Sequence, residues 1–312
     1  MCRDPSPVAV IREALERFRS RRPLRTGSFL VTLWGDAVEP RGGALWLASL
    51  IRIAALFGLG ERLVRTTATR LAAEGWLARE LHGRRSLYRT GPEGRAWIRT
   101  AARRIYAVQG APRPFDWHLV VLPEGVPEGV RRALRWLGCG RLSGDVYVHP
   151  APERERLLAV LAADPRAAGA LVLRDPRPRA DPAVLRELGR RAWRLEELEA
   201  GYRDFLRRFA PWRALDPAGL SPEDALRARL LLVHDYRRLV LADPLMPADL
   251  LPADWPGLAA CRLCRDLYAR LLEPSERALD TRAPETRGHA AQARAWLRAR
   301  FGGPVEAAAA VA

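Results

Sequence analysis

The chain has 312 residues, more than a single hydrophobic core usually organises, and this length predicts two or three domains. Its 48% hydrophobic and 28% charged residues are typical of a globular protein, and no apolar run approaches the roughly 18 residues that a membrane span needs. The net charge of +16, in a chain without lysine, predicts a polyanionic partner such as nucleic acid, an anionic membrane surface or a phosphorylated ligand.

Helical periodicity dominates the chain as far as about residue 106. Apolar residues recur at helical spacing in residues 8–19 and 45–57, which predicts two amphipathic helices. The second of them ends at Gly58, and the tight turn Gly58-Leu59-Gly60 leads directly into a further helix. Two helices joined in this way are typical of a helix-turn-helix.

Residues 61–74 form the most informative of the predicted helices. Val64, Ala68 and Leu71 recur at helical spacing and mark a buried stripe. The solvent face and its flanks then carry Arg62, Arg65, Thr66, Thr69 and Arg70. Guanidinium forks and small hydroxyls suit base edges and phosphates, so this face is predicted to read the major groove of DNA. The alternative is an ordinary solvated helix face.

A short hairpin is predicted directly after this helix. Residues 76–80 and 86–90 read as two strands around a turn at 82–85, and a helix follows over 95–106. Arg84 and Arg85 lie at the tip of the hairpin, where we expect contacts with phosphate or the minor groove. Helix, turn, helix and basic hairpin together predict a winged helix-turn-helix over residues 1–109.

The rest of the chain changes character twice. After a linker rich in glycine and proline at 110–114, strands and helices alternate, which predicts a ferredoxin-like α+β domain over 110–180. Residues 181–312 are helical again, with an alanine-rich tail after 303. Helices are predicted over 185–209, 225–241, 258–272 and 286–301. The expected fold is therefore α+β and multi-domain.

Catalytic, metal and disulfide chemistry are not predicted. Cys261 and Cys264 have the spacing of a metal pair, but no second pair of ligands exists, and four cysteines are too few for a disulfide framework. The N-terminus lacks the apolar segment of a secretory signal, so we expect a cytoplasmic protein without a membrane partner. We expect no cofactor and no enzyme activity. A nucleic-acid-processing or acyl-CoA enzyme and a non-specific nucleic-acid binder remain the alternatives.

Three blocks of the sequence resemble the PaaX-like family of phenylacetic-acid catabolism repressors. They are the N-terminal run that starts SFLVTLWGDAVEPRGG and continues through GERLVRTTATRLAAEGWLARELHGRRSLY, the central GCGRLSGDVYVHP and the C-terminal LLVHDYRRLVLADPLMPADLLPADWPG. The resemblance implies a winged-helix repressor of operator DNA, with a Cas2-like ferredoxin domain in the middle. It also implies a homodimer that is released from DNA by an aryl-CoA thioester such as phenylacetyl-CoA.

For such an effector, we expect the helical C-terminal region, 181–312, to be the effector-binding and dimerisation domain. Arg229, Arg237 and Arg238 are expected to meet the phosphates of coenzyme A, since arginine forks match phosphate oxygens. His234 is expected to be either structural or in contact with the ligand, and Trp255 to line an aryl pocket, although aromatic residues at helical spacing are more often part of the core.

Overall fold

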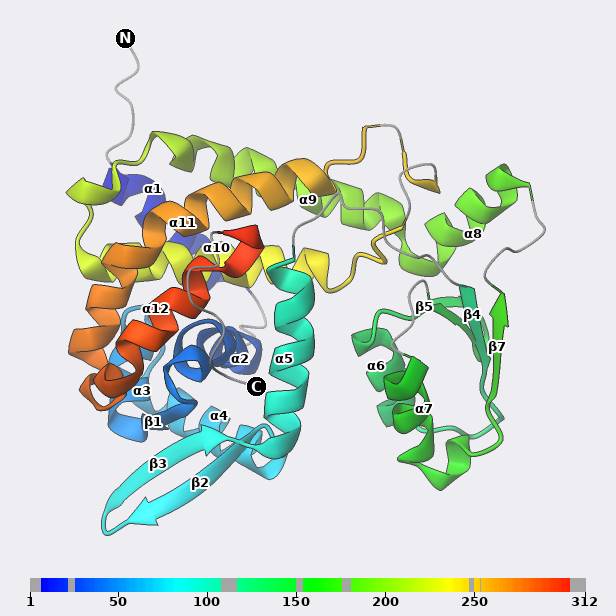
Figure 1. Cartoon of the computed structure of the whole chain (residues 1–312), viewed down its shortest axis with the longest axis horizontal. Helices are drawn as coiled ribbons and strands as arrows, with labels where there is room; N and C mark the ends of the chain where they lie inside the picture. The colour runs from blue at the N-terminus through cyan, green and yellow to red at the C-terminus, as the bar shows by residue number, and fades with distance from the viewer. Residues whose placement is uncertain are drawn as a thin grey trace. The chain divides into compact units, whose positions relative to one another are not determined.

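The computed structural model is mostly helical, with two small sheets (Figure 1). The predicted linker at 110–114 and the alanine-rich tail after 303 lie outside the described part of the chain. None of the helices within that part is long and apolar enough to cross a membrane. The residues described are 7–21, 26–107, 117–149, 154–175, 181–246, 250–252 and 254–303.

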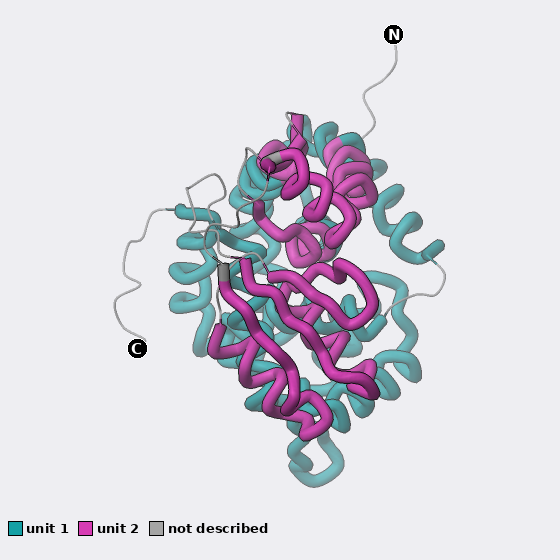
Figure 2. Tube along the Cα trace, turned by 90° about the vertical axis from the view of Figure 1, so that its right-hand side faces the viewer, with its two compact units in different colours: residues 1–108, 207–236, 261–312 teal, residues 109–206, 237–260 magenta. Residues whose placement is uncertain are grey.

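The chain packs as two compact units (Figure 2). Unit 1 combines Met1–Val108, Arg207–Tyr236 and Cys261–Ala312, and unit 2 combines Gln109–Leu206 and Arg237–Ala260. Unit 1 therefore draws on both ends of the chain. This division follows the packing of the chain and uses segments that are not consecutive in the sequence. The three consecutive domains expected from the sequence stay a prediction.

Unit 1 begins with helices that each bury one face. α1 (Pro7–Ser20) buries Ile11, Leu15 and Phe18, the apolar residues that its helical spacing puts on one side. The elements that follow are α2 (Thr26–Leu33), a π-helical turn Trp34–Val38, a 3-10 turn Glu39–Arg41, the strand β1 (Ala44–Trp46) and α3 (Leu47–Ala55).

The strand β1 corrects the prediction of a continuous helix over 45–57. Leu45 pairs with Tyr88 and Trp46 with Leu87, so that β1 becomes the third strand of an antiparallel sheet in the order β1-β3-β2. The residues that pair with β1 come from a distant part of the chain. Helical periodicity is a local signal, so it cannot reveal this pairing.

The next elements confirm the predicted helix, hairpin and helix. They are α4 (Glu61–Ala73), β2 (Leu77–His82), β3 (Arg85–Thr90) and α5 (Pro92–Ile105). Gly75 follows α4 with a φ of +75°, a conformation that glycine adopts without strain and that ends the helix before β2. α5 starts earlier than predicted, because proline is favoured in the first helical turn.

The C-terminal helices are longer and more broken than the sequence indicated. The predicted helix 185–209 is two helices, since Arg194 adopts a left-handed φ of 51° between them. The helix predicted to end at residue 272 instead continues to Arg282, with Pro274 inside it. The elements are α8 (Pro182–Trp193), α9 (Leu195–Phe209), α10 (Pro222–Val240), α11 (Gly257–Arg282) and α12 (Ala290–Arg298).

The core of unit 1 is built from both ends of the chain. Leu50 of α3 and Val64 of α4 belong to the same buried cluster as Leu230 of α10 and Leu279 of α11, and each is at most 1% exposed. Burying a leucine side chain stabilises a fold by about 1.5–3 kcal/mol. The elements predicted to bind DNA thus share their core with the C-terminal helices.

Unit 2 contains a four-stranded antiparallel sheet in the order β5-β6-β4-β7. Val120 of β4 and Tyr147 of β6 are fully buried against Leu134 of α6 and Leu157 of α7, so both helices pack on one face of the sheet. The elements in chain order are β4 (Trp117–Val121), α6 (Glu128–Trp136), β5 (Gly140–Ser143), β6 (Val146–His149), α7 (Arg154–Ala162) and β7 (Leu171–Asp175).

Candidate nucleic-acid interface

The helix α4 presents the polar face that its sequence predicts. Val64 and Ala68 are 0% exposed and Leu71 is 4% exposed, which confirms the buried stripe. Thr67 is buried beside them. The five polar residues singled out from the sequence all lie on the exposed side, and they are Arg62, Arg65, Thr66, Thr69 and Arg70.

The arginines of this face are held only by weak surface contacts. Arg65 pairs with Glu61 at 2.7 Å and Arg70 with Glu74 at 2.6 Å, one helical turn apart and with every partner about half exposed. Exposed pairs of this kind contribute less than about 1 kcal/mol. The guanidiniums can therefore exchange a carboxylate for a phosphate or a guanine at little cost.

The hairpin β2–β3 carries Arg84 and Arg85 at its tip, where the chain turns through Gly83 with a φ of +59°. Both arginines are exposed. The guanidinium of Arg85 also lies 4.1 Å from the centre of the Trp46 ring, a cation–π contact between β3 and the neighbouring strand β1. Arg85 is thus held in place by the sheet and remains open to solvent.

Two arginines that the sequence did not single out hold the end of α3, just before the turn into α4. Arg19 of α1 donates from Nε to the carbonyl of Phe57 at 3.2 Å, and Arg227 of α10 donates from Nε to the carbonyl of Leu56 at 3.0 Å. The last carbonyls of a helix lack partners within that helix. The position of the turn before α4 is consequently fixed by α1 and α10.

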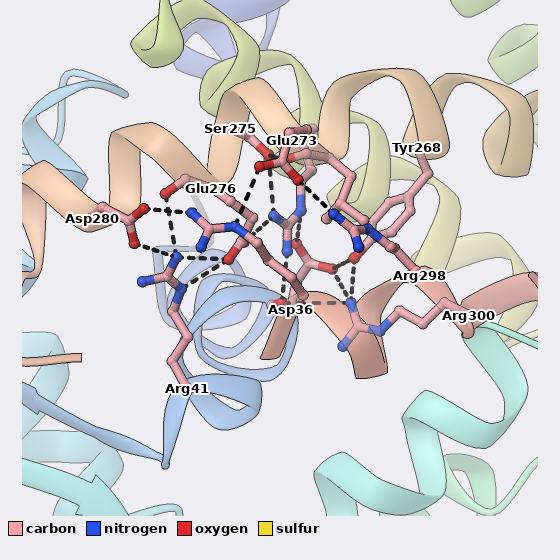
Figure 3. Close-up of polar contacts among 12 residues, drawn as sticks. Asp36, Arg41, Tyr268, Glu273, Ser275, Glu276, Asp280, Arg298 and Arg300 are labelled. Carbon is pink, nitrogen blue, oxygen red and sulfur yellow. Dashed lines mark hydrogen bonds and ion pairs between the residues drawn. The ribbon is translucent and has the colours of Figure 1, made fainter. Parts of the chain in front are cut away.

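A second group of polar residues lies in the interior of unit 1, where the π-helical turn meets the C-terminal helices (Figure 3). We call it the buried ionic cluster. It is defined by five charged residues, Asp36, Arg41, Arg229, Glu276 and Arg300, each of which is at most 8% exposed.

Two carboxylates bind the three guanidiniums of the buried ionic cluster. Asp36 accepts from Nε of Arg229 at 2.8 Å and from Nη1 of Arg300 at 2.5 Å. Glu276 accepts from Nη1 of Arg229 at 2.6 Å and from Nη2 of Arg41 at 2.7 Å. Each buried charge has an opposite charge in contact, as the cost of removing ions from water demands.

The tyrosines Tyr106 and Tyr268 complete the shell of Asp36, and their hydroxyls donate to it at 2.6 and 3.2 Å. Burial alone would raise the pKa of Asp36, but the charges of Arg229 and Arg300 and the two hydroxyls hold it below the usual carboxyl value. A lowered pKa stabilises the fold at pH values above the ordinary carboxyl pKa. That contribution is lost as the pH falls through the lowered value.

The buried ionic cluster was not predicted. Its one local signal is a charge inside an apolar segment, as with Asp36 in FLVTLWGDAV and Arg229 in ALRARLLLV. A charge in such a segment must find a partner, but the sequence does not say which. The pairing only becomes visible once the fold has brought the segments together.

The residues predicted to bind an effector are distributed over both units. Arg229 is enclosed by the buried ionic cluster, so its predicted contact with a ligand would require that cluster to open. His234 is buried, with Nδ1 at 2.8 Å from the hydroxyl of Thr32. Arg237 is buried and Arg238 is exposed, and both belong to unit 2 with Trp255.

Trp255 is partly buried, and its ring lies 5.8 Å from the ring of Tyr202. The two cysteines with metal-pair spacing, Cys261 and Cys264, are buried free thiols. Among the residues that the structure describes, no group of three histidine, cysteine or acidic side chains is placed to hold a metal ion. The effector contacts stay a prediction.

Comparison with known proteins identifies relatives of this chain. A model of PaaX-like protein matches residues 25–94, and a model of the PaaX-like protein C-terminal domain matches residues 193–281. The transcriptional repressor PaaX of Escherichia coli (strain K12) is 35% identical over 257 residues, which cover 80% of this chain and 81% of that repressor. Among solved structures, uncharacterized protein Rv0674 from Mycobacterium tuberculosis is 25% identical with a TM-score of 0.41, covering 76% of this chain and 89% of its own.

Proposed function

The chain belongs to the PaaX-like family of transcriptional repressors, and from this membership we propose that it represses an operon for the catabolism of a phenylacetate-type aromatic acid by binding operator DNA. The family is one of regulators, so the chain is not an enzyme. This removes the alternative of a nucleic-acid-processing or acyl-CoA enzyme. We further propose that the repressor is a homodimer, that it acts in the cytoplasm and that an aryl-CoA thioester releases it.

The DNA-binding part of the proposal is a winged helix-turn-helix. Its support is the order of α3, a tight turn, α4 and the hairpin β2–β3, together with the exposed polar face of α4. In this arrangement α4 enters the major groove, with Arg62 and Arg65 on base edges and Arg70 and the threonines beside them. The observation that carries it is the division of α4 into a buried apolar stripe and a basic outer face.

For unit 2 we propose the ferredoxin-like, Cas2-like domain that the sequence predicts. The order β4, α6, β5, β6, α7, β7 is the β-α-β-β-α-β order of that fold, and the sheet is antiparallel throughout. We assign no catalytic role to this domain. We propose instead that it takes part in the homodimer together with the helical C-terminal region.

The proposed function is tested by a gel shift on the DNA upstream of the chain's own gene. The protein is expected to shift that duplex at nanomolar concentration and a scrambled duplex only at concentrations about a thousandfold higher or more. Phenylacetyl-CoA is expected to reverse the shift. Equal affinity for both duplexes would contradict a sequence-specific repressor and favour a non-specific nucleic-acid binder.

Replacing both Arg84 and Arg85 by alanine is expected to weaken binding to every duplex alike. Exposed arginines at a hairpin tip neutralise phosphates, and each phosphate contact adds about 0.9 to the slope of log affinity against log salt concentration. The slope should therefore fall by about one or two units while operator preference is kept. An unchanged slope, measured by fluorescence anisotropy between 50 and 200 mM salt, would place the hairpin away from the DNA.

A further inference from the structure

The outer side of α4 includes a large apolar side chain among its polar ones. Leu63, in the first turn of the helix, is 43% exposed, whereas Leu71 of the buried stripe is 4% exposed. Single exposed leucines are common on protein surfaces, so exposure alone does not make Leu63 functional. The residues beside it on the helix show what it can contact.

Thr66 adds a second apolar group beside Leu63. Residues three apart are neighbours on a helix surface, so the two side chains lie next to each other. Thr66 is exposed, and its hydroxyl donates to the backbone carbonyl of Arg62, one turn earlier, at 2.9 Å. Because the hydroxyl is turned back toward the helix, the methyl group is the part of Thr66 that is left for a partner. We call Leu63 and the methyl group of Thr66 the apolar pair.

The apolar pair lies among side chains that attract DNA by their charge. Arg62 precedes Leu63 in the chain and Arg65 follows it, and both arginines are exposed. The approach to this turn is open, since a Cβ at Gly60, directly before the helix, would meet no atom of the described residues within 4 Å beyond its chain neighbours. DNA that is drawn to the arginines therefore meets the apolar pair as well.

The major groove of DNA offers an apolar group to such a helix. Its base edges present hydrogen-bond donors and acceptors, and their apolar feature is the C5 methyl group of thymine. A recognition helix places its N-terminal residues against the base edges, and Leu63 is the third residue of α4. Contact between the leucine and a thymine methyl group removes apolar surface of both from water, which favours thymine over the other bases.

We propose that the apolar pair reads a thymine methyl group in the operator, so that Leu63 and Thr66 determine sequence specificity together with the arginines. The inference rests on the proposed function, because it needs α4 to lie in the major groove of an operator. It gives Thr66 a contact through its methyl group, where the sequence suggested its hydroxyl. Since Arg62 adjoins the apolar pair and arginine favours guanine, the thymine is expected close to a guanine.

Replacement of thymine by uracil tests the contact, because uracil pairs with adenine as thymine does and lacks only the C5 methyl group. Each thymine of an operator duplex from upstream of the chain's own gene is replaced in turn, and the Kd is measured by fluorescence anisotropy. The original chain is expected to lose about three- to fivefold in affinity at one thymine of each half-site, the usual effect of one buried methyl group.

The variant Leu63→Ala is expected to remove this dependence on the methyl group. Uracil at the same position should no longer weaken binding, because the two changes delete the two partners of one contact and their effects do not add. The matched control is Leu81→Ala, since Leu81 is 67% exposed but lies on the hairpin strand β2. It should leave the effect of uracil unchanged, because the thymine methyl group lies in the major groove and the hairpin is expected at phosphate or the minor groove.

Two variants of Thr66 separate its methyl group from its hydroxyl. Thr66→Val keeps a methyl group and removes the hydroxyl that binds the carbonyl of Arg62, whereas Thr66→Ser keeps the hydroxyl and removes the methyl group. The valine variant is expected to keep its affinity for the operator, and the serine variant to lose about three- to fivefold. The opposite order would assign the contact with the base to the hydroxyl and would overturn the apolar pair.

The outcomes separate this inference from the function on which it rests. Equal affinity of the original chain for operator and scrambled DNA would refute the proposed function, and the apolar pair with it. Specific binding that no uracil weakens, or an equal effect of uracil in Leu63→Ala, would leave the repressor in place and overturn the inference. Unchanged affinity of Leu63→Ala for scrambled DNA shows that the variant is folded.

Discussion

Replacing Glu276 by alanine is expected to lower the free energy of unfolding by about 3–5 kcal/mol, the usual cost of removing one partner from a buried ion pair. Glu276 is 0% exposed and binds Arg41 and Arg229, which are 2% and 0% exposed. Its removal leaves two buried guanidiniums with fewer acceptors. A typical domain has only about 5–15 kcal/mol of stability, so this single loss is large.

The matched control is Glu273→Ala, on the same helix one turn earlier. Glu273 is about half exposed and binds Arg294 and Arg298 at 3.4 and 3.2 Å, so we expect a loss below about 1 kcal/mol. Urea unfolding followed by circular dichroism gives both values. Equal losses in the two variants would show that the buried ionic cluster does not stabilise unit 1 more than a surface pair does.

Replacing Arg62 and Arg65 together by alanine is expected to remove much of the preference for operator over scrambled DNA. Both side chains are exposed on the outer face of α4, and a bidentate arginine–guanine contact contributes about 1–3 kcal/mol of discrimination. Two such contacts supply much of the about 4–10 kcal/mol that separates specific from non-specific binding. The fold should be unaffected, because neither residue is buried.

The control for this loss of charge is Arg99→Ala with Arg103→Ala. These two arginines are also exposed and also lie in one helix of unit 1, α5, so the net charge changes equally. Their removal is expected to leave the ratio of specific to non-specific affinity unchanged in anisotropy titrations. An undiminished operator preference in the Arg62 and Arg65 variant would show that α4 does not read the DNA sequence.

Local patterns in the sequence predicted the local features of the fold. The buried stripe of α4 was visible because Val64, Ala68 and Leu71 repeat at the period of a helix. The hairpin was visible because a turn with glycine separates two short segments that read as strands. The exposure of the α4 arginines follows from the same helical period, because residues that do not fall on the buried stripe face the solvent.

Features that depend on distant residues were missed. β1 exists because Leu45 pairs with Tyr88, and α11 runs past Pro274 because Glu276 and Leu279 beyond it are buried. Proline normally ends or kinks a helix, a preference of about 3 kcal/mol that tertiary contacts here outweigh. A pocket lined by residues of α1, α9 and α10 likewise joins helices from separate parts of the chain, so no single segment of the sequence predicts it.

The sequence separations within the buried ionic cluster also bear on how the protein is made. Asp36 binds Arg229, 193 residues later, and Arg300, 264 residues later. While the ribosome has synthesised only the first third of the chain, Asp36 has neither partner, and Leu50 and Val64 lack α10 and α11, which contribute Leu230 and Leu279 to the same core cluster. Contacts of such length also make folding slow. We therefore expect that a prematurely terminated chain cannot occupy an operator, and that repression begins only after translation has reached the last helix.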